Sequence, residues 1–326
     1  MKSQKTFYYV KKYDFCDRDH FWIAKGLAML IALVCWVGAR YDYIISADVK
    51  HVYWSAIALF IVCSGFGVSE SYLKKRGLFH YVENKIIKIW IPSLIVLIGI
   101  ALIQGESWIS WLPKYPVALK GNFMYVIFCE YIVFWISFRS VHNRTARLLI
   151  LFGASLIAFI FIPETFSAKE VLFCFPVGVL ASQKVWKRKV REFKAGGKCL
   201  LLLASAAVAA AGWFAAGLVT LPYLSTLIWA VFYMAAAAAF LILVWILKAI
   251  PVMGIFAPVG VCSFMLYMLY DSVFDLLKPG ADWRICVLVV VILLIGAALL
   301  TWLRDLLVRW NKNMRRKGKT QLKGSM

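Results

Sequence analysis

The chain alternates long apolar windows with short polar segments. Windows of about 17 to 25 apolar residues are long enough for a helix to cross the hydrocarbon core of a bilayer. Ten windows approach or reach this length, the fifth being short: residues 21–39, 52–69, 86–104, 121–138, 148–163, 170–186, 199–219, 223–247, 259–277 and 283–303. The exact boundary between the fifth and sixth windows is not defined by the pattern. We therefore predict an all-α, polytopic membrane protein, a single bundle of about ten transmembrane helices.

The polar segments divide the chain into three parts. Residues 1–20 are expected to form a basic cytoplasmic arm, residues 21–303 the transmembrane domain, and residues 304–326 a basic cytoplasmic tail. The connections between windows are too short for a second globular domain. The end of the tail, residues 315–326, is polar and contains glycine, so we expect it to be disordered and attracted to anionic headgroups.

Composition and charge agree with a membrane protein. Apolar residues make up 63% of the 326 residues, which excludes a soluble domain. The net charge of +21 comes mostly from basic residues in both terminal segments and in alternate connections. Basic connections remain on the cytoplasmic side. We expect a multi-pass protein of the plasma (inner) membrane with both termini cytoplasmic, with the lipid bilayer and not nucleic acid as its partner.

The cysteines do not indicate a structural site. Eight are present, most of them in or beside the apolar windows, and no two form a Cys-x-x-Cys pair. We therefore predict no structural disulfide and no metal site.

Ionisable side chains inside the windows are the first site candidates, because an unpaired charge at bilayer depth is costly. Lys25 lies in the first window, Glu130 in the fourth and Asp271 in the ninth. A structural alternative exists for Glu130, which can pair with Lys25 or with a tyrosine hydroxyl. None of the four histidines is expected inside the bundle opposite Lys25, although His51 in the outer connection can approach a substrate.

Several of these residues belong to motifs that occur together in one protein family. The motifs are Lys25-Gly-Leu-Ala-Met-Leu-Ile-Ala-Leu-Val-Cys-Trp36, Leu59-Phe-Ile-Val-Cys-Ser-Gly-Phe-Gly-Val-Ser-Glu-Ser-Tyr72, Lys85-Ile-Ile-Lys88, Met124-Tyr125 with Glu130, Phe173-Cys-Phe-Pro-Val-Gly-Val-Leu180 and Ser263-Phe-Met-Leu-Tyr-Met-Leu-Tyr270. In this order and spacing, the chain resembles the acyltransferase 3 family. The resemblance implies a ten-span protein that O-acylates, most often O-acetylates, cell-surface polysaccharides or related acceptors.

The chain departs from the family pattern at its two histidines. Trp36 stands where the first-span histidine is expected, eleven residues after Lys25, and Tyr270 stands where the ninth-span motif ends in histidine. Eleven residues return to nearly the same face of a helix, so Lys25 and Trp36 share a face. The Arg-x-x-Arg of the third span is matched by Lys85 and Lys88, which keep the charge but lose bidentate phosphate geometry.

The resemblance implies that acyl-CoA, in the first instance acetyl-CoA, is a co-substrate and that no cofactor is permanently bound. Lys25, Lys85 and Lys88 would contact its phosphates, and the acyl group would pass Ser64 and Trp36 to an acceptor near the outer face.

An indole cannot act as a general base. Glu130, Asp271 or Tyr270 are the substitute catalytic candidates. Cys35 is an alternative acyl-accepting nucleophile, although an inert core thiol is the ordinary state of a buried cysteine.

Three functions remain open from the sequence. The first is a membrane acyltransferase, transferring groups other than aminoacyl groups, that moves an acyl group from acyl-CoA to a cell-surface glycan or lipid-linked hydroxyl acceptor. The second is a non-catalytic relative that binds an acyl donor or lipid-linked glycan or assists assembly. The third is a transporter or flippase, which intramembrane carboxylates favour.

Overall fold

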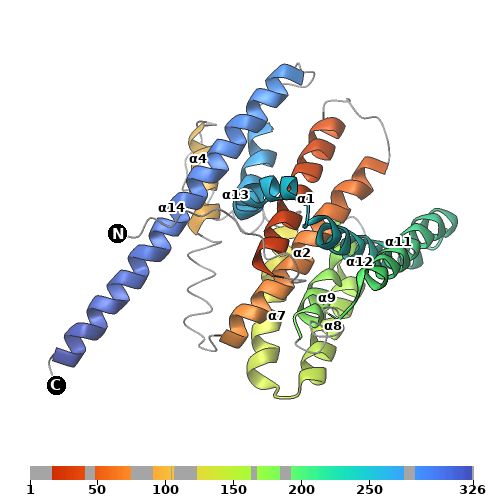
Figure 1. Cartoon of the computed structure of the whole chain (residues 1–326), viewed down its shortest axis with the longest axis horizontal. Helices are drawn as coiled ribbons and strands as arrows, with labels where there is room; N and C mark the ends of the chain where they lie inside the picture. The colour runs from red at the N-terminus through yellow and green to blue at the C-terminus, as the bar shows by residue number, and fades with distance from the viewer. Residues whose placement is uncertain are drawn as a thin grey trace. The chain divides into compact units, whose positions relative to one another are not determined.

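The computed structural model describes residues 17–40, 48–74, 91–103, 105, 123–162, 167–183, 192–274 and 283–324. These residues form ten α-helices and two short 3-10 helices, with no strand among them (Figure 1). The elements are α1 (Arg18–Arg40), α2 (Asp48–Lys74), α4 (Ile91–Ile103), α7 (Phe123–Ser140), α8 (Arg144–Phe161), η2 (Ser167–Val171), α9 (Cys174–Ala181), α11 (Ala195–Leu218), α12 (Pro222–Leu247), η3 (Pro251–Ile255), α13 (Phe256–Phe274) and α14 (Trp283–Gly324).

The apolar windows coincide with helices. Seven described segments are long and apolar enough to cross a membrane: Asp19–Ala39, Asp48–Tyr72, Arg144–Phe161, Ala195–Leu218, Pro222–Leu247, Pro251–Tyr270 and Arg284–Trp310. The three remaining expected windows contain α4, α7 and α9. The all-α, polytopic fold is thereby confirmed.

The chain divides into two compact units. Unit 1 contains Met1–Ser71 and Pro116–Gly260, and unit 2 contains Tyr72–Tyr115 and Val261–Met326. Unit 1 includes α1, α7, α8, α9, α11 and α12, together with most of α2. Most of the site candidates lie in unit 1.

Two glycines let α2 and α9 touch backbone to backbone within unit 1. A Cβ added at Gly65 of α2 would lie 2.2 Å from the carbonyl oxygen of Phe175, and one added at Gly178 of α9 would lie 2.0 Å from that of Val62. Both distances are too short for any side chain. The glycines of the Ser-Gly-Phe and Pro-Val-Gly motifs are thus packing residues, in the way that small residues bring membrane helices together.

A second reciprocal glycine pair joins α1 to the start of α13. A Cβ at Gly26 would lie 1.9 Å from the carbonyl oxygen of Phe256, and one at Gly260 would lie 1.7 Å from that of Trp22. Gly26 directly follows Lys25, so this close approach fixes the part of α1 that carries the lysine.

A short turn joins α7 to α8. The side-chain oxygen of Asn143 caps α8 by accepting hydrogen bonds from the N–H groups of Thr145 at 2.9 Å and Ala146 at 3.4 Å. Such a cap satisfies backbone donors that have no partner inside the helix. The turn places the two helices side by side, as Figure 1 also shows.

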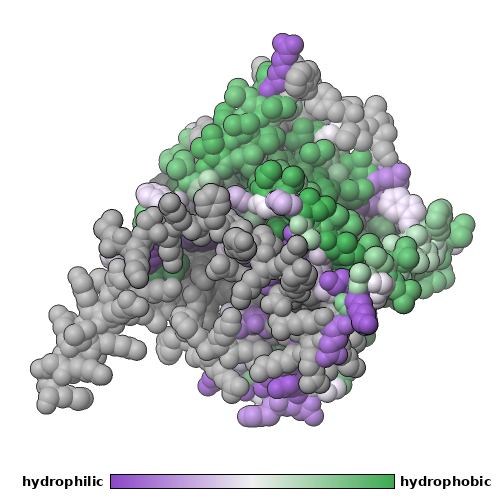
Figure 2. Space-filling view, in the orientation of Figure 1, coloured by the Kyte–Doolittle hydropathy of each residue, from purple (hydrophilic) through white to green (hydrophobic). Residues whose placement is uncertain are grey.

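The surface of unit 1 is apolar along its helices and polar at the α7–α8 turn. Figure 2 shows the apolar surface over α11 at the right of the view and polar residues at its lower edge, where α7 meets α8. The exposed apolar side chains of α11 include Leu200, Leu203, Val208, Phe214 and Leu218. An exposed apolar surface of this kind is suited to lipid.

For residues 315–324, the expected disorder is wrong. The last helix, α14, continues without a break through Gly324. Extending an existing helix needs no new nucleus, and the lysine, arginine, glutamine and leucine residues of this segment are good helix formers.

Candidate active site

Lys25 and Ser64 lie on neighbouring helices of unit 1. Lys25, on α1, is half-buried and close enough to Cys63 of α2 for its charge to act on the thiol. Ser64 follows Cys63, and its hydroxyl shares a hydrogen bond with the hydroxyl of Tyr131 on α7. Ser64 is thus linked to α7, at the residue that follows Glu130.

Glu130 is buried between α7 and α8. It is 4% exposed, and its Oε1 accepts a hydrogen bond of 2.8 Å from the hydroxyl of Ser155. Its Oε2 is buried without a hydrogen-bond partner among the described residues. The described partner is therefore a serine on the next helix, not the lysine or tyrosine considered from the sequence.

The two residues at the family's histidine positions lie in different units. Trp36 is half-buried on α1, in unit 1. Tyr270 is 1% exposed on α13, in unit 2, where its ring meets that of Tyr267 edge to face at 5.3 Å. The phenol is therefore buried, whereas the indole is half-buried.

Three predicted site residues cannot be given contacts. Lys85 and Lys88 lie outside the described residues. Asp271 belongs to α13, but its side chain also lies outside the described part of the chain. Their roles stay predictions.

The structure brings together a polar cluster around His51, which we call the His51 cluster: His51, Trp229, Tyr233 and Glu170, together with Lys169, the residue before Glu170 on η2. The Nδ1 of His51, on α2, lies 2.8 Å from the hydroxyl oxygen of Tyr233 on α12. The imidazole stacks on Trp229, with ring centroids 3.7 Å apart and planes 10° apart. The carboxyl group of Glu170 on η2 lies close enough to the same tyrosine hydroxyl to act on it electrostatically.

Lys169 adds a buried charge to the His51 cluster. The lysine is 1% exposed, and its ammonium nitrogen lies 4.8 Å from the ring centroid of Phe159 and 5.0 Å from that of Tyr223. These are cation–π contacts. Neither this nitrogen nor the Oε2 of Glu170 has a hydrogen-bond partner in the described part of the chain.

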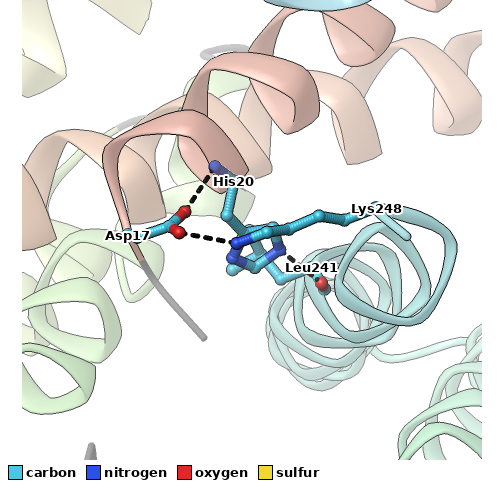
Figure 3. Close-up of polar contacts among 4 residues, drawn as sticks. All are labelled: Asp17, His20, Leu241 and Lys248. Atoms are coloured by element: carbon cyan, nitrogen blue, oxygen red, sulfur yellow. Dashed lines mark hydrogen bonds and ion pairs between the residues drawn. The ribbon is translucent and has the colours of Figure 1, made fainter. Parts of the chain in front are cut away.

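A second polar cluster joins the start of α1 to the end of α12, and we call it the Asp17 cluster. Asp17 accepts a hydrogen bond of 2.7 Å from the backbone N–H of His20 and binds the ammonium of Lys248 at 2.6 Å (Figure 3). The Nε2–H of His20, which is 0% exposed, donates to the carbonyl oxygen of Leu241 at 2.8 Å. This cluster fastens two helices together.

The sequence did not single out Tyr233, Glu170, Lys169 or the Asp17 cluster. Lys169 and Lys248 stand at the ends of apolar windows, where lysines are normally solvated. Only the folded chain reveals their burial, which for Lys248 depends on Asp17, 231 residues away. His51 was considered from its place in the outer connection, but no pattern indicated its tyrosine partner.

Comparison with known proteins identifies the family. No curated protein and no solved structure matches the chain. A model of the acyltransferase 3 family, described as an acyltransferase domain, matches residues 23–303, which include the helices that carry Lys25, Ser64, Glu130 and the His51 cluster. The match extends over most of the chain and agrees with the order of the motifs. The protein therefore belongs to the acyltransferase 3 family of membrane acyltransferases.

Proposed function

We propose that the protein moves an acyl group, in the first instance acetyl, from acyl-CoA to a hydroxyl of a cell-surface glycan or lipid-linked acceptor. The observation that carries this proposal is the family match over residues 23–303. In the expected orientation, the Asp17 cluster and the phosphates of the donor lie on the cytoplasmic side of the plasma membrane. The His51 cluster lies towards the outer side, so the thioester end of the donor is proposed to reach along the acyl path towards it.

The donor side of the proposed reaction uses basic residues. Lys25 is half-buried on α1 beside α2, where a cation can attract a phosphate or polarise a thioester carbonyl. Lys85 and Lys88 are proposed to extend this surface. The hydroxyls of Ser64 and Tyr131 line the interface of α2 with α7 and are proposed to lie along the acyl path.

Transfer to a hydroxyl acceptor is tested by the lability of the product. Membranes from cells that make the protein are incubated with radiolabelled acetyl-CoA, and label is measured in the glycan fraction before and after mild alkali, which cleaves esters but not amides. We expect alkali-labile label above that of membranes without the protein. Equal label in both preparations would contradict the proposed function.

Trp36 favours a second candidate function, a non-catalytic relative that binds the donor or a lipid-linked glycan. An indole has one hydrogen-bond donor and no basic nitrogen. If the natural chain has lost its chemistry, Trp36→His, alone or with Tyr270→His, will transfer acetyl while the natural chain does not. Glu130→Gln in the natural chain provides the opposite test, because an enzyme that uses this carboxylate loses transfer when it is replaced.

A further inference from the structure

The imidazole of His51 is held in a defined plane and direction. Trp229 covers one face of the ring, and Trp213 of α11 packs edge-on with its centroid 5.1 Å away. The hydroxyl of Tyr233 fixes Nδ1 at 2.8 Å. Side chains from α11 and α12 therefore orient one histidine of α2, which is the support that a catalytic group needs.

The hydrogen bonds also select the form of the imidazole. A phenol has one proton to donate, and an ionised carboxylate can only accept. The Glu170 carboxylate acts on the Tyr233 hydroxyl and attracts its proton, so the hydroxyl oxygen is left to accept from the Nδ1–H of His51. The other ring nitrogen, Nε2, then carries the free lone pair, and no hydrogen bond from the described residues reaches it. A neutral imidazole with its Nδ1–H fixed and its Nε2 open is the form that acts as a general base.

A buried polar atom without a hydrogen bond accompanies this imidazole. One carboxylate oxygen of Glu170, whose charge acts on the Tyr233 hydroxyl, has no partner among the described residues. Buried polar atoms without hydrogen bonds are costly unless a ligand satisfies them. A carboxylate oxygen and an imidazole nitrogen with a free lone pair both accept hydrogen bonds, so the ligand indicated is one that donates them, as a hydroxyl does.

We propose that the His51 cluster is the acceptor subsite of the enzyme, taking a carbohydrate hydroxyl, with His51 as its general base. The proposal rests on the proposed acyltransferase function. His51 and Trp36 flank the connection between α1 and α2, so the histidine lies at the same end of these helices as the tryptophan that replaces the family imidazole. Tyr233 and Glu170 are positioning residues.

The proposed step balances as an ordinary acyl transfer. The Nε2 of His51 takes the proton of the acceptor hydroxyl as its oxygen attacks the acyl carbon. The new carbon–oxygen bond forms, and the carbon–sulfur bond of the thioester breaks. CoA leaves as a thiolate that takes a proton from water, and the imidazolium of His51 returns its proton to solvent.

The first experiment measures transfer from radiolabelled acetyl-CoA in membranes containing the full chain. We expect His51→Gln to slow transfer by at least about 100-fold, the usual contribution of a general base, while CoA binding is unchanged. Added imidazole restores part of the activity of His51→Ala. His142→Gln, at an exposed histidine in the α7–α8 turn, keeps the natural rate. Transfer by His51→Gln at the natural rate would overturn the subsite and leave the acyltransferase function intact.

The second experiment examines the positioning residues. Carbethoxylation of His51 by diethyl pyrocarbonate, measured by mass spectrometry, reports the availability of the imidazole. Tyr233→Phe and Glu170→Gln should change the labelling rate and shift the acid limb of the pH–rate profile, on which Asp48 and Lys50 also act. Unchanged labelling and an unchanged profile in both variants would show that these residues are only structural.

The same labelling distinguishes failure of the subsite from failure of the function. If the natural protein transfers no acetyl, the proposed function and the catalytic role of His51 are both wrong. Methyl glucoside at millimolar concentration then serves as the probe of binding. Protection of His51 from carbethoxylation would retain the carbohydrate site, and full reactivity would remove it.

Discussion

The two polar clusters on α12 differ in whether their hydrogen bonds are closed. In the Asp17 cluster, the carboxylate caps α1 and binds Lys248, and the ring of His20 donates to a backbone carbonyl. In the His51 cluster, the ammonium of Lys169 and one oxygen of Glu170 remain without hydrogen bonds in the described part of the chain.

Both clusters contain a nearly inaccessible lysine, yet the physical situation of the two lysines is opposite. The side chain of Lys248 is 1% exposed and has a carboxylate at 2.6 Å. Lys169 is equally buried, and its ammonium contacts only the faces of aromatic rings. A network in which every hydrogen bond is made stabilises an interface. A network with unmade hydrogen bonds lowers stability and leaves polar atoms available to a ligand. The difference indicates structure at one end of α12 and chemistry at the other.

The largest expected effect is the loss of the ion pair in the Asp17 cluster. Lys248→Met leaves the Asp17 carboxylate without its cation, and breaking a buried pair lowers the free energy of unfolding by about 3 kcal/mol or more. Unfolding can be followed with a thiol-reactive dye, because Cys63 and Cys174 are free and buried in the folded protein. The exposed thiols Cys129 and Cys199 set the baseline.

The double variant Asp17→Asn with Lys248→Met provides the control for this ion pair. Asparagine is as good a helix cap as aspartate and carries no charge. The double variant should therefore be more stable than Lys248→Met alone. If both melt at the same temperature, the ion pair does not hold the two helices together.

The next effect concerns the crossing of α2 with α9. His51 lies on α2, and α9 follows η2, which carries Glu170. Gly65→Ala places a methyl group 2.2 Å from the carbonyl oxygen of Phe175, and overpacking of this kind costs about 1 to 3 kcal/mol. Gly67→Ala is the matched control, since no atom lies within 4 Å of its added Cβ. The dye assay should show a lower melting temperature for the first variant only. Equal stability would contradict the glycine crossing.

The smallest effect has the opposite sign. Lys169→Met removes a buried charge that has no hydrogen bond, and an apolar replacement of a buried charge can raise the free energy of unfolding by about 1 kcal/mol. Lys194→Met, at an exposed lysine, should leave the melting temperature unchanged. A lower melting temperature for Lys169→Met would mean that the two lysines have the same structural role.

The fold could be predicted well because hydropathy measures how apolar a segment is, and this property decides which segments cross a bilayer. The window 223–247 corresponds to α12, which begins at Pro222 and ends at Leu247. Proline at the first helical position needs no N–H partner, and this marks the start of the helix in the sequence. The continuation of α14 to Gly324 was missed because composition describes solubility and not helix propagation.

The candidate site could be predicted only in part. Glu130 was recognised because a carboxylate inside an apolar window is costly, and it is indeed buried. The partner of His51 could not be predicted, because Tyr233 is 182 residues away and is one of 15 tyrosines. Nothing local distinguishes a tyrosine that orients a histidine from one that lies at the membrane surface.

The Asp17 cluster also constrains how the protein can be made. The carboxylate that starts the first helix finds its cation 231 residues later, and His20 finds its carbonyl 221 residues later. While the chain is being synthesised, the first helix enters the membrane with its aspartate and histidine lacking these partners. Its anchorage is complete only when α12 has been inserted. Biogenesis therefore includes a closure step between α1 and the much younger end of α12, and chains truncated before Lys248 would present an unfinished α1 to cellular quality control.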